Sequence, residues 1–188
     1  MSKSDQVYKY TFSRVEYIRS ISDTGTGRGI MANLRHGIGK KPGELPEIWG
    51  MIFDNIPDEL MGCKDASNAE WAIYTALMLY ALHQQGNDMP MNQKDMSIGR
   101  AASRLVKNED DTQRILNRLN LVVTSVSPED LAYHLRGVVQ LLKNEKIPLD
   151  YAKLAKELYL FYDQERAGAI KLSWGRDFYR YKLDLLGN

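Results

Sequence analysis

The chain has 188 residues, 44% of them hydrophobic, and a formal net charge of +1. This length supports one compact body with two helical lobes, and the near-zero charge excludes a polycation that coats nucleic acid indiscriminately. The single cysteine, Cys63, excludes an internal disulfide and suits a reducing compartment. We expect its thiol to lie in a loop or in the core.

The sequence predicts neither a secretory signal nor a membrane-spanning helix. Residues 1–10 are polar and lack the basic and apolar stretches of a secretory signal. The longest apolar run, 71–82, is far shorter than the roughly 20 residues of a membrane-spanning helix. We therefore expect a soluble cytoplasmic protein.

Helical patterns run along nearly the whole chain, without persuasive strand alternation, so we expect an all-α fold: a two-lobed helical bundle of about eight to ten helices. Residues 24–43 contain six glycines, and a glycine inside a helix costs about 1 kcal/mol relative to alanine. We interpret this segment as a basic loop flanking one short helix near Met31–His36. It carries four positive charges, whereas residues 44–70 carry a local charge of −6, so charge is segregated along the sequence.

Three helix starts follow. Ser67 and Glu70 form a capping-box pattern ahead of the apolar run, and because that run is apolar on nearly every face, we expect it to be the central post of the bundle. Another helix is expected to start at Ser127-Pro128, and the chain restarts at 148–150 before the next buried helical stripe.

The polar tract 107–111 is the expected break between lobes. It divides the chain into an N-terminal helical lobe, 1–107, and a C-terminal helical lobe, 108–188.

No catalytic set assembles from the sequence. The three histidines, His36, His83 and His134, fall in different predicted elements and outside any metal-binding spacing, and we expect them at helix surfaces or caps. Glycine-rich nucleotide loops and a hydrolase nucleophile elbow are absent from the sequence. The carboxylates are scattered, although the sequence alone leaves open their convergence in a metal-nuclease cleft. We expect a protein without enzymatic activity, cofactor or metal.

The positive signal is a row of basic residues. Five of them follow one another at intervals of 4, 3, 7 and 4 residues, which would place them on one face of a continuous helix: Arg100, Arg104, Lys107, Arg114 and Arg118. The expected break at 107–111 interrupts such a helix, but two short helices that meet there could still present one basic strip. Arg136 and Lys143 repeat the interval of seven on the next helix. Such a strip suits phosphate groups, because arginine offers a planar fork of donors and lysine a mobile charge. The alternative is an ordinary solvated face whose arginines pair with the acids of 109–111.

Several short segments, in this order, resemble the CasB family of small subunits of type I-E CRISPR Cascade complexes. They are ALMLYALHQ at 76–84, SIGRA at 97–101, RILNRL at 114–119, HLR at 134–136, IPLDYA at 147–152 and WGRDF at 174–178, with MANLR at 31–35 as a looser match. Together they cover about residues 67–179 in family order.

The resemblance implies an all-helical, non-catalytic subunit that acts in antiviral defence. It implies a second copy of the chain and contacts with the large subunit and the repeated backbone subunits that hold the CRISPR RNA (crRNA). It further implies contacts with crRNA and with the opened target DNA, including the displaced strand. In the opened target, the guide RNA pairs with one DNA strand and the other strand is displaced. This exchange of strands is nearly balanced in energy, so contacts with the displaced strand shift the equilibrium toward the opened DNA.

Nine basic residues are expected to bind nucleic acid. The family patterns point to Arg100, Arg114 and Arg136, and charge and spacing add Arg35, Lys40, Lys41, Arg104, Arg118 and Lys143.

The C-terminal aromatic residues have two interpretations. Trp174, Phe178 and Tyr179 are expected to pack in the core, with stacking on unpaired bases as the alternative. Arg176 and Asp177 are expected to form a local ion pair or to contact a neighbouring subunit.

Two other functions fit parts of the pattern. Residues 97–105 resemble a recognition helix of a helix-turn-helix DNA-binding protein, with Arg100 and Arg104 toward the groove. A pure protein scaffold, whose arginines only pair with acids of its neighbours, is the second.

Overall fold

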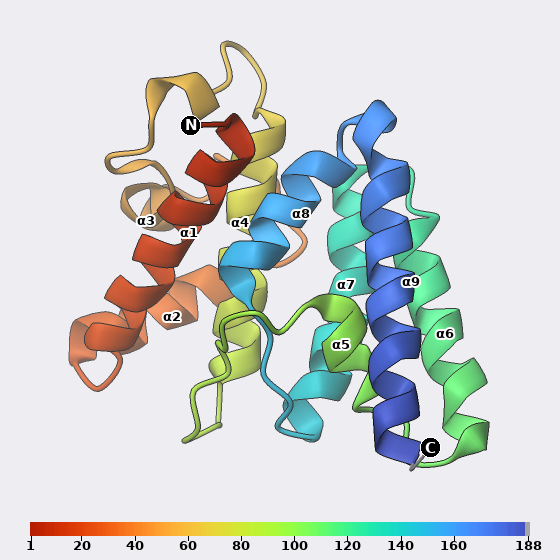
Figure 1. The fold of residues 1–188 in the computed structure, drawn as a ribbon. Coiled ribbons are helices and arrows are strands. Elements are labelled where there is room, and N and C mark those ends of the chain that lie inside the picture. The colour runs from red at the N-terminus through yellow and green to blue at the C-terminus, as the bar shows by residue number, and fades with distance from the viewer. Residues whose placement is uncertain (187–188) are drawn as a thin grey trace.

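The structure, a computed structural model, describes residues 1–186, with side chains to residue 182, and this part of the chain is all-helical (Figure 1). Its nine α-helices are α1 (Lys3–Ser20), α2 (Gly25–His36), α3 (Trp49–Phe53), α4 (Asn68–Gln84), α5 (Ile98–Ser103), α6 (Glu109–Val123), α7 (Pro128–Asn144), α8 (Tyr151–Phe161) and α9 (Gln164–Leu186). Two 3-10 turns, Pro46–Ile48 and Asp58–Leu60, flank α3. The described range contains one isolated β-bridge, Asn92 with Leu149, and no strand. The expected all-α bundle of eight to ten helices is confirmed.

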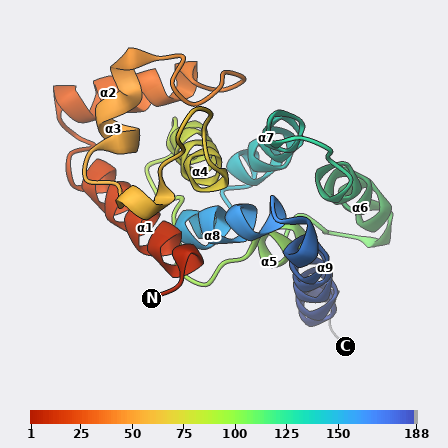
Figure 2. The same ribbon diagram turned by 90° about the horizontal axis from the view of Figure 1, so that it is seen from above.

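The α4 helix forms the central post, as the sequence predicts. Residues 69–83 of α4 are buried except Trp71, because apolar side chains on every side leave no face suited to water. α1, α2, α7 and α8 pack around α4 (Figure 2). At its start, the Glu70 amide donates to the Ser67 hydroxyl at 3.0 Å and the Ser67 amide donates to the Glu70 carboxylate at 2.6 Å. The capping box is therefore confirmed.

The other expected helix starts are also capped. The Ser127 hydroxyl accepts from the Asp130 amide at 3.1 Å, and the Asp150 carboxylate accepts from the Lys153 amide at 2.9 Å. Each such cap is worth about 1 kcal/mol.

The glycine-rich segment is more helical than expected. α2 begins at Gly25, six residues ahead of the expected Met31, because the Thr24 hydroxyl accepts from the Gly27 amide at 3.0 Å and caps the helix. Gly27 lies so close to the preceding turn that a Cβ atom there would overlap the Ile21 carbonyl oxygen. Part of the glycine content is thus used for close packing rather than for a loop.

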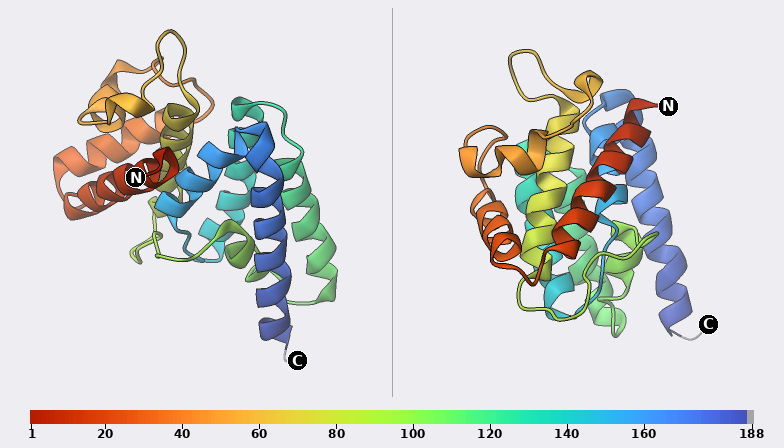
Figure 3. Two further views of the ribbon diagram at one scale, coloured as in Figure 1. Left: turned by 45° about the horizontal axis from the view of Figure 1, so that its top comes forward. Right: turned by 90° about the vertical axis from the view of Figure 1, so that its left-hand side faces the viewer.

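Elements from both halves of the chain pack together. α1 lies against α8, and α5 lies against α9 (Figure 3). The division into lobes at residue 107 stays a prediction.

Burial of His83 corrects one expectation. Its side chain is fully buried, and its Nδ1 lies 2.8 Å from the Tyr151 hydroxyl. Burial lowers the pKa of His83 to about 4, so the imidazole is neutral at physiological pH. His36 ends α2 and is exposed, and the half-buried His134 lies 3.2 Å from Asp130 on the same helix, both as expected.

The aromatic residues of α9 divide between core and surface. Trp174 and Phe178 are buried, which confirms their core role, whereas Tyr179 is 53% exposed and the expectation for it is wrong. Asp177 accepts a hydrogen bond from the Ser97 hydroxyl at 2.5 Å, which joins α9 to the start of α5, rather than forming an ion pair with Arg176. The other alternative, a contact of these residues with a neighbouring subunit, stays a prediction.

The expectation for Cys63 allowed a loop or the core, and the structure places the residue, exposed, in the loop before α4. Within residues 1–186, no helix combines the length and the apolar character that crossing a membrane requires.

The contact between α5 and α9 leads to a first prediction. A Cβ atom at Gly99 would overlap the Trp174 carbonyl oxygen, so Gly99→Ala forces the two helices apart. We expect a loss of about 1–3 kcal/mol in the free energy of unfolding, measured by urea titration. Gly175→Ala, on α9 with open space around its Cβ, is the control and should gain up to about 1 kcal/mol. Equal stability of the two variants would contradict the close packing.

Glu157 leads to a second prediction. Its carboxylate accepts from the Trp174 indole N–H at 2.7 Å, and burial raises its pKa from 4.5 to about 7. Between these values the native state keeps a proton that the unfolded chain has released, so stability falls as pH rises from about 4.5 to 7. Glu157→Gln removes the titration and keeps an acceptor for Trp174.

Relative to this variant, the wild type should lose about 3 kcal/mol between pH 4.5 and 8. Urea unfolding at both pH values measures the difference. Glu59→Gln, which changes an exposed carboxyl, is the control and should leave the profile as it is. Parallel profiles for the wild type and Glu157→Gln would show that the buried carboxyl does not titrate in this range.

Candidate nucleic-acid interface

Three adjoining hollows lie along the α7 helix. The first, of about 210 Å³, lies between the segment after α2, the α4 helix and α7. It shares Tyr133 and Arg136 with a second hollow of about 270 Å³ between α6 and α7, and that one shares Arg118, Gly137 and Gln140 with a third, of about 390 Å³. The shared residues place the three hollows next to one another along α7.

Four of the nine expected basic residues line these hollows, and we refer to them as the basic groove: Lys40, Arg118, Arg136 and Lys143. They come from the segment after α2, from α6 and from α7. Lys40, Arg118 and Arg136 are exposed, and Lys143 is half-buried. Residues far apart in the sequence are thereby gathered beside one helix.

The electrostatics of the groove favour an anion. Burial lowers the pKa of Lys143, and the positive charge of Arg35 lowers it further. Arg35 therefore lies close enough to Lys143 for the two charges to repel each other. A phosphate placed between such cations relieves that repulsion and forms charge-assisted hydrogen bonds.

Gly137 gives the groove its depth at the middle of α7. A Cβ atom there would meet open space, and the residue lines both the second and the third hollow. The sequence analysis did not single out Gly137, although a glycine in the middle of an apolar-striped helix costs helix stability and therefore invites a search for a packing or functional reason. Tyr133 and Gln140 are further lining residues that charge and spacing did not indicate.

Three other basic residues near the groove are ion-paired. Lys41 Nζ lies 3.5 Å from Glu129 on α7. A fourth hollow, which adjoins the third, is lined by Lys107 and Arg114. Lys107 lies 2.6 Å from Glu145 and Arg114 lies 2.6 Å from Asp111. Lys107 and Arg114, two members of the expected basic strip, thus form ion pairs on an exposed face, as the alternative interpretation of the strip expected.

The five residues of the expected strip lie on two helices, because α5 ends at Ser103 and α6 begins only at Glu109. Arg100 lies under α9, with its Cζ 4.3 Å from the centroid of the Tyr181 ring, and its Nε is buried without a hydrogen-bond partner in the described structure. Arg104 is exposed but lines none of the hollows along α7. Since α5 has six residues and is covered by α9, it is not placed to act as a recognition helix.

Comparisons with known proteins define the class. A family model of the CRISPR-associated protein Cse2 matches residues 30–179. The CasB structure from Thermobifida fusca is 32% identical, with a TM-score of 0.81 over 93% of this chain and 98% of that chain. CasB from M. ruber is 21% identical, with a TM-score of 0.69 over 93% and 98% of the two chains.

A chain of a CRISPR RNA-guided surveillance complex is 16% identical, with a TM-score of 0.74 over 96% of this chain and 97% of that chain. This likeness and the one to M. ruber CasB concern the fold. None of the curated protein sequences compared with the chain matches it significantly.

The fold and the family match together define an all-helical CRISPR-associated protein. The chain belongs to the Cse2 family, and its resemblance to CasB proteins is confirmed.

Proposed function

We propose that this chain is the non-catalytic small subunit of a type I-E Cascade complex, in which it stabilises the opened target DNA, the R-loop, and the crRNA–target duplex. Its partners are the repeated backbone subunit, the large subunit, a second copy of itself, crRNA and target DNA. The proposal is supported by membership of the Cse2 family and by the fold that the chain shares with a subunit of a CRISPR RNA-guided surveillance complex. The observation that carries the nucleic-acid role is the basic groove.

The groove suits a phosphate backbone better than a specific base sequence. Its cations sit on three separate elements and line hollows that run along α7, which matches the extended shape of a strand. Each phosphate neutralised on a single strand adds about −0.7 to the slope of log affinity against log salt. Four contacts therefore make binding steeply dependent on salt.

The remaining expected residues divide by position. Arg35 reinforces the groove beside Lys143, and Lys41 reaches it once an anion displaces Glu129. Arg114 extends the path past Arg118 along α6. Arg100 and Arg104 remain proposed contacts outside the groove, where Arg100 also braces α9.

Membership of Cascade leads to a third prediction. A tag on this chain, followed by gentle purification from its host and sequencing of the bound RNA, should recover guide-length RNAs with a constant repeat-derived end. The same tag on a variant chain that lacks α4 provides the background, because loss of the central post abolishes the fold. Recovery of the chain alone, or with random RNA only, from cells that express a CRISPR array would reject the proposal.

Gly137 leads to a fourth prediction. Gly137→Glu places a carboxylate among Arg118, Arg136 and Lys143 without steric conflict, since the Cβ position is open. We expect affinity for a labelled single-stranded oligonucleotide to fall at least about tenfold at low salt, as two or more phosphate contacts are lost. The salt slope should become shallower by about 0.7 for each lost contact.

The matched control is Gly168→Glu, which introduces the same charge at another helical glycine with open space, exposed on α9 and outside the groove. Its affinity and salt slope should equal those of the wild type. If the chain is a pure protein scaffold, Gly137→Glu and Gly168→Glu should bind DNA equally. That result would remove the groove from the proposed function.

A further inference from the structure

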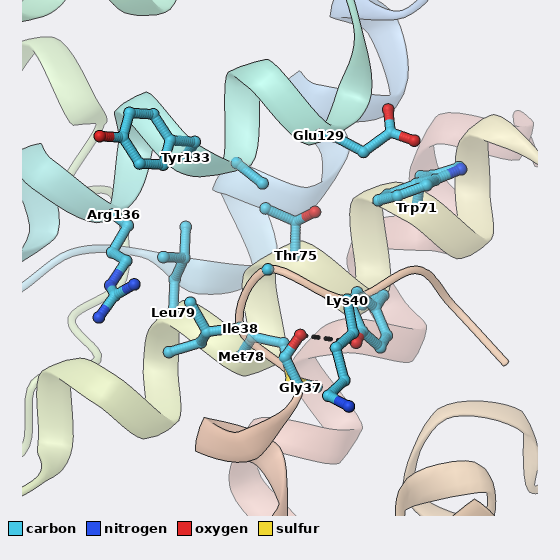
Figure 4. Close-up of a pocket in the computed structure, with 13 residues that line it drawn as sticks. Gly37, Ile38, Lys40, Trp71, Thr75, Met78, Leu79, Glu129, Tyr133 and Arg136 are labelled. Atoms are coloured by element: carbon cyan, nitrogen blue, oxygen red, sulfur yellow. Dashed lines mark hydrogen bonds between the residues drawn. The ribbon is translucent and has the colours of Figure 1, made fainter. Parts of the chain in front are cut away.

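The first hollow differs in character from the rest of the groove. It opens between the segment Gly37–Lys40 and the helices α4 and α7, with Tyr133 and Arg136 projecting from α7 on one side, Trp71 on the other and Thr75 between them (Figure 4). Its floor is formed by buried side chains of α4, Tyr74, Met78 and Leu79. Apolar and aromatic groups thus surround a cavity whose mouth is positively charged.

The wall opposite α7 is held in place by close packing. The Tyr74 hydroxyl donates to the Gly37 carbonyl at 2.8 Å. Burial raises the pKa of Tyr74 to about 12, so this donor stays protonated. A Cβ atom at Gly37 would lie 2.9 Å from the same hydroxyl and would overlap the Met78 sulfur. The Gly37 end of this wall is therefore packed directly against α4.

The size of the cavity limits what fits inside. About 210 Å³ is less than the roughly 300–1,000 Å³ typical of pockets for drug-sized ligands. A single planar ring system is accommodated, whereas a whole nucleotide with its phosphate is not. A charged group attached to such a ring has to stay at the mouth.

The charges at the mouth match that requirement. Lys40 and Arg136 line the cavity, and its one acid, Glu129, is held by Lys41 at 3.5 Å. Arg136 and the 70% exposed Tyr133 also line the next hollow of the basic groove. A backbone that follows the groove therefore passes the mouth with its phosphates beside Arg136.

Inside the cavity, the described residues offer no free polar group that would read a base. Thr75 is 2% exposed, and its hydroxyl oxygen is buried beside the Tyr162 hydroxyl rather than open to the cavity. The Tyr74 hydroxyl is already donated to the Gly37 carbonyl. A lining that is mostly apolar and aromatic gives contact area to any base without selecting one.

We propose that this hollow receives one unpaired nucleobase from a single strand whose phosphates lie in the basic groove. The inference rests on the proposed function and adds that the chain binds a nucleobase as well as the phosphate backbone of the strand. Bases of a displaced strand have lost their pairing partners, and burial on aromatic side chains restores part of the lost stacking. The base contact also adds affinity that does not vary with salt, because it involves no counterion release.

The test compares two labelled strands with equal phosphates: a 20-nucleotide oligothymidine and a 20-unit strand of abasic sites. The full chain should bind the base-bearing strand about tenfold more tightly, as expected for one stacked base. Ala132→Phe, which fills the hollow from α7, and Tyr133→Ser, which removes the exposed ring, should both reduce this ratio toward one. Tyr17→Ser, which removes an exposed tyrosine of α1 outside the hollow, should keep the wild-type ratio.

The outcomes separate the two proposals. Equal, salt-dependent binding of both strands by the wild type would overturn the base site and leave the groove intact. Binding of neither strand would overturn both. If Ala132→Phe keeps the wild-type ratio but no longer recovers protein neighbours in a tagged purification, the hollow takes a protein segment and the base site is rejected.

Discussion

The α4 helix has apolar side chains on all sides, and 14 of its 17 residues are buried. Full burial of a large apolar side chain is worth about 1.5–3 kcal/mol. A packing that leaves one side of α4 in water is therefore less stable than one that covers every side. α1, α2, α7 and α8 are placed by this requirement. The inner stripe of α7, which includes Leu135 and Val139, faces the core, and this turns Arg136 and Gly137 outward to form the groove.

The elements that the sequence predicts well are those with local signals. The helices begin near Ser67, Ser127 and Asp150 as expected, and each of these residues caps its helix through an amide three positions on. Trp174 and Phe178 lie in the core because their spacing matches one face of a helix. The order of the family segments likewise indicates the correct family before any contact is known.

Features that depend on tertiary packing were beyond the sequence pattern. His83 follows an apolar run, and only the position of Tyr151 on α8 shows that it is buried as a neutral partner. Arg100 matches a family segment, yet its place under α9 depends on the close approach at Gly99. Lys40 lines the same hollow as Arg136 because the segment at Gly37 packs on α4, and no spacing along the chain indicates that arrangement.

The basic groove draws its charges from three segments that meet only when the bundle is folded. An unfolded chain keeps the same charges but scatters them, so it has no comparable site for a strand. A ligand that binds only the folded form stabilises it by about 2.7 kcal/mol when present at one hundred times its dissociation constant. Nucleic acid bound as proposed would therefore stabilise the folded bundle. A subunit in an assembly that holds nucleic acid would resist heat and proteolysis longer than the free subunit.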